Sequence, residues 1–200
     1  SIFKDIYKLS PGGMISIGLD LKRNTEIFYW STIEEANLAK QEVFSGSYLS
    51  AVDTLQSKLS VAVNSQMHAD VPLGAFLSGG VDSSTIAALM QEQSSKKVKT
   101  FSIGFDDNRY NEAEHAKLVA NHLGTDHHDM YVTSKDALNV LPLLPDMFDE
   151  PFADSSQIPM YLVSKIAKSK VTVCLSGDGG DELFGGYNRY LVASKLWNKI

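Results

Sequence analysis

Cysteine is nearly absent from the sequence, since Cys174 is the single one among 200 residues. One cysteine can form neither an internal disulfide nor a cysteine-rich metal site, so we expect a reducing compartment. No apolar run reaches the roughly 18 residues that a membrane-spanning helix needs. The N-terminus does not show the basic stretch followed by an apolar one that marks a secretory signal. These absences favour a cytoplasmic chain with no membrane association.

Long basic runs are also missing. The sequence has 18 Lys and Arg residues against 24 Asp and Glu residues, which gives a formal net charge of −6. Nucleic-acid binders depend on neutralising phosphates, so we expect no nucleic-acid partner. Hydrophobic residues make up 44% of the chain, and this is enough to bury the core of one domain of ordinary size.

From Tyr48 onward, apolar runs that suit strands alternate with stretches of helical periodicity. Strands are predicted at 71–77, 98–105, 128–132 and 171–175, and helices at 48–63, 86–90, 111–123, 135–148, 159–168 and 190–197. This alternation implies right-handed crossovers and a parallel sheet. The predicted fold class is therefore α/β, a doubly wound parallel sheet with helices on both faces.

The first thirty residues follow another pattern. The β-prone runs 14–17 and 26–30 flank Lys22–Thr25 and predict a β-hairpin. Two strands alone are not stable in water, so this hairpin must pack on something else. The polar stretch 31–47 is predicted to be a connection between residues 1–30 and an α/β domain over 48–200. The helical stretch near Ile200 has no stop signal, so we expect the α/β domain to be truncated there.

The first candidate site is the segment Ser78–Ser84, SGGVDSS, between a predicted strand and an amphipathic helix. Glycines let the backbone approach a ligand, and the N–H groups at the start of the helix would face it. Together with the serine hydroxyls, they would form a cradle for phosphate. Asp82 would repel a phosphate unless a cation such as Mg²⁺ lay between them. In the simpler alternative, the glycines only turn the chain and Asp82–Ser84 caps the helix.

The second candidate site is Ser176–Tyr187, SGDGGDELFGGY, which again follows an apolar strand. Clustered carboxylates repel one another unless a cation lies among them. If the two strands are neighbours, Asp82 and Asp181 could share one metal ion. A solvated acidic turn is the alternative. Neither segment contains GxxxxGK[ST] or GxGxxG, which disfavours a Walker-type NTPase and a dinucleotide-dependent dehydrogenase.

The first segment resembles the pyrophosphate-binding loop of the ATP pyrophosphatase group. The second resembles the signature of glutamine-dependent asparagine synthetases and their amidotransferase relatives. The segments 100–105, 111–112, 150–156 and 159–162 also match that family, so the resemblance runs from about Val71 to Tyr187. It implies an adenine nucleotide alpha hydrolase-like, Rossmann-like fold. It also implies ATP-dependent amide formation through an acyl-adenylate, with release of AMP and pyrophosphate, and Mg²⁺ as the cofactor.

The resemblance assigns roles residue by residue. Asp82, Asp178 and Asp181 would be catalytic, because Asp82 and Asp181 would hold Mg²⁺ and Asp178 would steer ammonia or accept its proton. The residues implied in nucleotide or substrate binding are Leu77, Ser78, Gly79, Gly80, Ser83, Ser84, Ile103, Ser176, Gly177, Glu182 and Tyr187. Ile103 suits an ordinary core position equally well. Glu182 and Tyr187 would either contact the ligand or only brace their loop.

Three departures from the family pattern leave alternatives open. Residue 1 is Ser, where the glutaminase domain begins with a nucleophilic cysteine, and the part of the synthetase domain that holds a catalytic lysine is missing. Residues 1–30 then resemble the tail of that glutaminase domain, and we expect a segment of a longer enzyme. Many family members have Glu at the position of Asp178. The amidated carboxylate is therefore aspartate or another one, such as a sugar acid.

The resemblance leaves the nitrogen source open between glutamine and free ammonia, and a homodimer is a possible assembly. A nucleotide-binding module without catalysis is a further alternative for a chain with half a site. The histidines lack the HExxH spacing and have no cysteine nearby, so solvated or capping roles are favoured over zinc binding for His68, His115, His122, His127 and His128.

Overall fold

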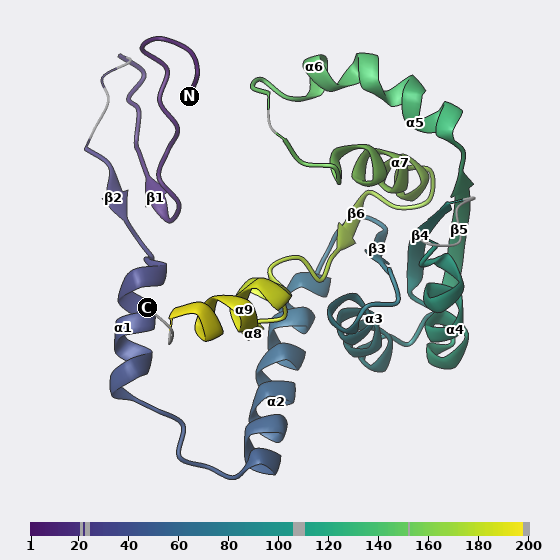
Figure 1. Ribbon diagram of the computed structural model, residues 1–200, viewed down its shortest axis with the longest axis horizontal. Coiled ribbons are helices and arrows are strands. Elements are labelled where there is room, and N and C mark those ends of the chain that lie inside the picture. Colours follow the sequence, from purple (N-terminus) through teal and green to yellow (C-terminus); the bar gives the residue numbers. More distant parts are fainter. Residues whose placement is uncertain (21, 23–24, 106–110, 152, 198–200) are drawn as a thin grey trace. The chain divides into compact units, whose positions relative to one another are not determined.

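The computed structural model (Figure 1) describes residues 1–20, 22, 25–105, 111–151 and 153–197. It divides into two compact units, Ser1–Thr54 and Leu55–Ile200. In the first unit, β1 (Gly13–Met14) pairs antiparallel with β2 (Ile27–Phe28). The predicted hairpin is confirmed, with shorter strands than expected. Part of its predicted turn lies outside the described residues.

The segment 31–47, predicted to be a connection, contains a helix. Helix α1 spans Thr32–Gln41, and the Ser31 hydroxyl caps it by accepting from the Glu34 N–H at 3.4 Å. Acidic residues lie in its first turn and Lys40 lies in its last, which suits the helix dipole. The segment has no clear apolar periodicity, so these weak local signals were the only indication of a helix.

The second unit is built on a parallel sheet of four strands in the order β5-β4-β3-β6. The strands are β3 (Leu73–Phe76), β4 (Lys99–Phe105), β5 (Asp126–Val132) and β6 (Val173–Leu175). Each falls on or beside a predicted strand. The chain moves outward from β3 through β4 to β5, and then returns to place β6 on the other side of β3.

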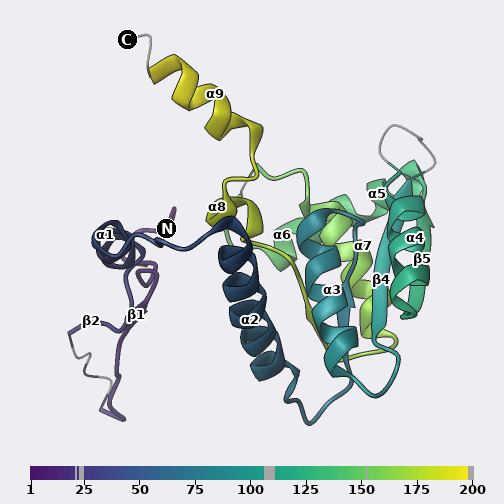
Figure 2. The ribbon, with the colours of Figure 1, turned by 90° about the horizontal axis from the view of Figure 1, so that it is seen from below.

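Helices cover both faces of this sheet, which confirms the predicted α/β class. Helices α2 (Tyr48–Met67), α3 (Val81–Gln93) and α4 (Ala113–Leu123) lie side by side in Figures 1 and 2. On that face, Val63 of α2 packs with Ala75 of β3 and Met90 of α3. Helices α5 (Ser134–Val140) and α7 (Gln157–Lys168) pack on the opposite face, where Val163 contacts Phe101.

Strand β4 shows how the pleat divides these two faces. Phe101 is fully buried in the cluster with α7, and Ile103 packs against the same cluster. The alternate residues Thr100 and Ser102 point to the opposite face, and they are the buried polar residues of the described core. A fully buried hydroxyl must find a hydrogen-bond partner, so this face of β4 must carry a polar network.

Two predicted helices are corrected by the structure. The stretch 135–148 is divided into α5, a 3₁₀ turn η1 (Leu141–Leu143) and α6 (Leu144–Met147), with a proline in the first turn of each of the last two. Proline cannot donate a backbone hydrogen bond inside a helix, so it starts a new one. In α4 the N-cap residue is Glu112 and not Asn111, although the Asn111 Oδ1 accepts from the Ala113 N–H at 3.2 Å.

The acidic second loop also contains helical structure. Its glycine-rich start is followed by the short helix α8 (Gly180–Phe184), and α9 (Asn188–Trp197) comes next. Helix α8 begins and ends at left-handed glycines, Gly179 and Gly185. The loop is therefore a compact turn–helix–turn.

Two further sequence features can be placed in the fold. Cys174 lies half-buried in β6, and burial raises the pKa of its thiol to about 11. Such a thiol stays protonated and unreactive at neutral pH. No helix among the described residues has the length and apolar character needed to cross a membrane.

Candidate active site

The carboxyl ends of β3 and β6 leave the sheet side by side. Ala75 of β3 lies opposite Leu175 of β6, so the loops that begin at Leu77 and Ser176 start next to each other. The order of the strands in the sheet reverses here, because β4 and β6 lie on opposite sides of β3. Such a reversal opens a crevice where open α/β sheets bind ligands. A cavity of about 1540 Å³ lies at this point and is lined by both loops.

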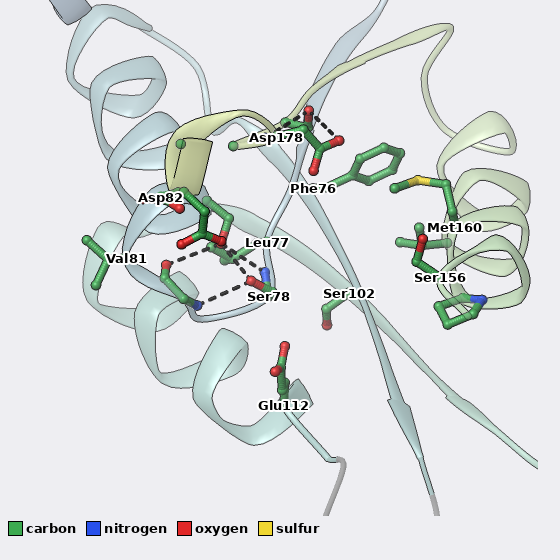
Figure 3. Close-up of a pocket in the computed structure, with 18 of the residues that line it drawn as sticks. Phe76, Leu77, Ser78, Val81, Asp82, Ser102, Glu112, Ser156, Met160 and Asp178 are labelled. Carbon is green, nitrogen blue, oxygen red and sulfur yellow. Dashed lines mark hydrogen bonds between the residues drawn. The ribbon is translucent and has the colours of Figure 1, made fainter. Parts of the chain in front are cut away.

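The first loop is held in shape by its own serines. The Ser78 N–H donates to Ser83 Oγ at 3.2 Å, and the two serine hydroxyls lie 2.9 Å apart. The Gly80 N–H donates to Ser78 Oγ at 3.2 Å. These bonds fold the chain tightly against the start of α3, so that the turn and the helix N-terminus form one surface. Figure 3 shows Ser78 and Asp82 on this side of the cavity.

Glycine is required at position 79 for two reasons. Its φ of +83° lies in the left-handed region, and a Cβ there would lie 2.8 Å from the backbone N of Ala116 on α4. Gly80 is the N-cap residue of α3 and has no side chain that could cap this helix. The N–H groups and the positive dipole end of α3 can therefore face an anion in the cavity.

The two loops are packed directly on each other. A Cβ on Gly177 would lie 2.7 Å from the backbone N of Ser83 and 2.8 Å from the carbonyl carbon of Asp82. A Cβ on Gly180 would lie 2.5 Å from the carboxyl carbon of Asp82. The acidic loop thus depends on glycine for close contact with the first turn of α3. This contact brings the carboxylate of Asp82 against the residue that precedes Asp181.

Asp82 and Asp181 both line the cavity. The carboxylate of Asp181 lies against Gly186 at the far end of its loop. No group of three or more His, Cys, Asp and Glu side chains suited to a metal occurs in the described part of the chain. Mg²⁺ typically takes one or two carboxylates and completes its shell with water and substrate phosphates. Two carboxylates beside a helix N-terminus suit an ion that completes its shell with water and phosphate, and a protein-only metal cage does not describe this site.

The remaining acidic side chains of the second loop are held by neighbours. The Ser176 hydroxyl donates to Asp178 Oδ2 at 3.1 Å, which orients a carboxylate that faces the cavity. The Tyr187 hydroxyl donates to Glu182 Oε1 at 2.9 Å, and this bond raises the pKa of Tyr187. The guanidinium of Arg189 lies 4.0 Å from the centre of the Tyr187 ring. Tyr187 and Glu182 therefore brace the loop and also form part of the cavity wall.

Comparison with known proteins places this arrangement in a family. A family model for asparagine synthase matches residues 54–200, which contain the whole cavity. The chain belongs to the asparagine synthase family. Asparagine synthetase [glutamine-hydrolyzing] 1 of Bacillus subtilis is 36% identical over 92% of this chain and 28% of its own length. Asparagine synthetase B [glutamine-hydrolyzing] of Escherichia coli is 34% identical over 66% of this chain and 26% of its own length.

The chain spans about a quarter of the length of these two curated relatives, 28% and 26%. Among solved structures, it is similar to the NH3-dependent NAD synthetase from Campylobacter jejuni. That similarity has a TM-score of 0.47 and 16% identity, and it covers 68% of this chain and 60% of the other.

The family resemblance seen in the sequence assigned residues that the structure now locates. The cavity is lined by Leu77, Ser78, Gly80, Asp82, Ser83, Ile103, Ser176, Gly177, Asp178, Asp181, Glu182 and Tyr187. Gly79 and Ser84 do not appear in that lining. Gly79 packs against α4, and the Ser84 Oγ is buried without a hydrogen-bond partner. Their predicted contact with pyrophosphate stays a prediction, and Gly79 has a clear structural role.

The far wall of the cavity was missing from the predicted set. Apolar residues from β3, β4 and α7 form much of it, namely Phe76, Phe101, Phe105, Met160 and Val163, and polar ones include Ser102, Glu112, Asp154 and Ser156. Figure 3 shows Met160 and Ser156 across from Asp82 and Asp178. The Ser156 N–H donates to Asp154 Oδ1 at 2.8 Å, and this bond lowers the pKa of Asp154. The apolar members resemble core residues in the sequence, and no role was assigned to Phe101, Phe105 or Met160 although they lie in segments that match the family.

Proposed function

We propose that the intact protein joins nitrogen to a carboxylate with cleavage of ATP to AMP and pyrophosphate, and that aspartate is converted to asparagine. The observation that carries this proposal is the pairing of two loops at one reversal of the sheet. One loop offers the N–H groups of α3 and two serine hydroxyls, and the other offers carboxylates to the same cavity. A group of N–H and hydroxyl donors beside a pair of carboxylates suits a nucleoside triphosphate with a divalent cation.

The first step forms the acyl-adenylate. A carboxylate oxygen of the substrate attacks the α-phosphorus of ATP, the bond from that phosphorus to the β-bridging oxygen breaks, and pyrophosphate leaves. The N-terminus of α3, with Ser78 and Ser83, would stabilise the charge on the departing pyrophosphate. Asp82 and Asp181 would hold Mg²⁺, which when bound would neutralise phosphate charge.

The second step forms the amide. Ammonia attacks the acyl carbon, the bond from that carbon to the AMP oxygen breaks, and AMP leaves with both electrons. Asp178 would take the proton that the nitrogen loses, because its carboxylate faces the cavity and Ser176 orients it. The apolar far wall would limit the water that competes with ammonia for the adenylate.

Glutamine is the proposed nitrogen source, since the relatives of Bacillus subtilis and Escherichia coli are named as glutamine-hydrolyzing. We propose the glutaminase reaction for the intact protein. The cytoplasmic location, the homodimer and the domain boundaries expected from the sequence stay predictions.

Product analysis of the intact protein tests the proposal. Incubation with Mg·ATP, aspartate and an ammonium salt is expected to release AMP and pyrophosphate in equal amounts with asparagine. Omission of aspartate should abolish AMP release, because the attacking carboxylate is then missing. Release of ADP and phosphate would overturn the adenylate step. AMP release that depends on a sugar acid and not on aspartate would overturn the choice of substrate.

A further inference from the structure

A chain of polar side chains runs behind the cavity wall on the face of the sheet that α4 covers. His127 of β5 lies opposite Thr100 of β4, and its Nδ1 is 2.9 Å from the Thr100 hydroxyl. Its Nε2 is 3.2 Å from the Ser102 hydroxyl. Thr100 also contacts the Thr125 hydroxyl at 3.0 Å. Both ring nitrogens of a half-buried histidine are therefore engaged by hydroxyls, where the sequence had favoured a solvated or capping histidine.

The end of this row of side chains favours one direction for its hydrogen bonds. The Thr125 hydroxyl lies 3.4 Å from the carbonyl oxygen of Ala120, which can only accept. In the direction that uses this acceptor, Thr125 donates to Ala120 and the Thr100 hydroxyl donates to Thr125. In that direction Thr100 accepts from His127, with the imidazole proton on Nδ1. The Nε2 atom is left as an acceptor, and the Ser102 hydroxyl donates to it.

Ser102 links these hydrogen bonds to the cavity, because it is one of the residues that line it. In the view of Figure 3 it lies between Ser78 and Ser156. With its proton turned toward His127, the Ser102 oxygen can offer only lone pairs to a ligand. Its surroundings contrast with the start of α3, where N–H groups and serine hydroxyls can donate to phosphate. Ser102 would therefore bind a hydrogen-bond donor of the ligand, whereas the start of α3 would bind an acceptor such as a phosphate oxygen.

We propose that His127 is a positioning residue that fixes Ser102 as a hydrogen-bond acceptor. Ser102 then binds an N–H or O–H donor of the nucleotide and does not bind its phosphates. The donor would be the amino group of the base or a hydroxyl of the ribose. This inference rests on the proposed function for the identity of the nucleotide. It adds a residue outside the cavity that orients the nucleotide within it.

The protonation state of His127 sets this polarity. Burial is the main cause that lowers the pKa of His127, with His128 and Lys117 acting in the same direction and Asp129 opposing them. The ring is therefore neutral at neutral pH. As pH falls through this lowered pKa, the ring gains a proton on Nε2 and donates to Ser102 Oγ. The Ser102 proton must then turn toward the cavity, and the wall changes from acceptor to donor.

The first test reads the tautomer directly on the intact protein without a ligand. Nitrogen-15 NMR of the histidine rings is expected to show His127 protonated on Nδ1 and unprotonated on Nε2 near neutral pH. His127→Phe identifies the signal by its loss, and the exposed His122 on α4 serves as a reference. A His127 ring protonated on Nε2 would mean that the side-chain hydrogen bonds run in the opposite direction. This result would overturn the inference, whether or not the protein binds ATP.

The second test reads the consequence for binding by isothermal titration calorimetry. Mg·ATP is compared with triphosphates that each lack one donor: purine riboside triphosphate, 2′-deoxy-ATP and 3′-deoxy-ATP. Wild-type protein is expected to bind one of them roughly three- to tenfold more weakly than ATP, the usual range for one hydrogen bond. Ser102→Ala should bind that analogue and ATP equally. In the wild type this discrimination should fade as His127 becomes protonated.

The outcomes separate the inference from the proposed function. Equal binding of ATP and all three analogues by the wild type would overturn the inference and leave the proposed function standing. Failure to bind Mg·ATP at all would overturn the proposed function, while the tautomer could still be read. His122→Phe, which changes an exposed histidine outside the cavity, should keep the wild-type discrimination.

Discussion

Asp82→Asn is expected to weaken binding of Mg·ATP to the intact protein by roughly a hundredfold. Loss of a residue that only supports a metal ligand costs about 10- to 100-fold in affinity or activity, so a direct ligand should reach the upper end. The substitution keeps the size of the side chain that packs against Gly180, so the fold should hold. Titration calorimetry with Mg·ATP gives the affinity, and thermal unfolding checks the fold.

The matched control is Asp146→Asn, which removes the same charge from an exposed position on α6 outside the cavity. It should bind Mg·ATP as the wild type does, because exposed charges at such a distance are screened by salt. If Asp82→Asn and Asp146→Asn both bind normally, the metal role given to Asp82 is wrong.

Gly177→Ala is expected to reduce ATP-dependent amide formation by more than about tenfold and to cost about 1–3 kcal/mol of folding stability. The added Cβ would lie 2.7 Å from Ser83 N and 2.8 Å from the carbonyl carbon of Asp82. Both are backbone atoms, so the two loops would have to separate. Steady-state rates and denaturant unfolding of the intact protein measure the two effects.

Gly124→Ala is the control for Gly177→Ala, because it strains the backbone without disturbing the contact between the two loops. Gly124 ends α4 with a φ of +73°, and no atom lies within 4 Å of a Cβ placed there. The alanine should cost about 1–2 kcal/mol from the left-handed conformation alone and leave activity intact. Equal activity of Gly177→Ala and Gly124→Ala would mean that contact between the two loops is not needed.

The sheet could be predicted because its signals are local. Apolar runs such as 98–105 and 171–175 lie between polar breaks, and Gly124 stops α4 where the sequence indicates. The reversal that brings β6 beside β3 is not local. It followed only from the assumption that two glycine-rich strand ends share a ligand, and the register Ala75↔Leu175 supports that assumption.

The parts that sequence reasoning missed depend on contacts between distant residues. His127 finds its partners on β4, 25 and 27 positions away in the chain, so its spacing from other histidines said nothing about its role. One signal was present, because Thr100 and Ser102 place two hydroxyls on one face of an otherwise apolar strand. The apolar far wall, with Phe76 and Met160, carried no comparable signal, since such residues are ordinary in cores.

A crystal structure of the intact protein with magnesium and a non-cleavable ATP analogue tests the central claim most directly. We predict a magnesium ion that touches both Asp82 and Asp181, with the β- and γ-phosphates on the N–H groups at the start of α3. A triphosphate bound away from α3, or a metal ion held without either aspartate, would contradict the account.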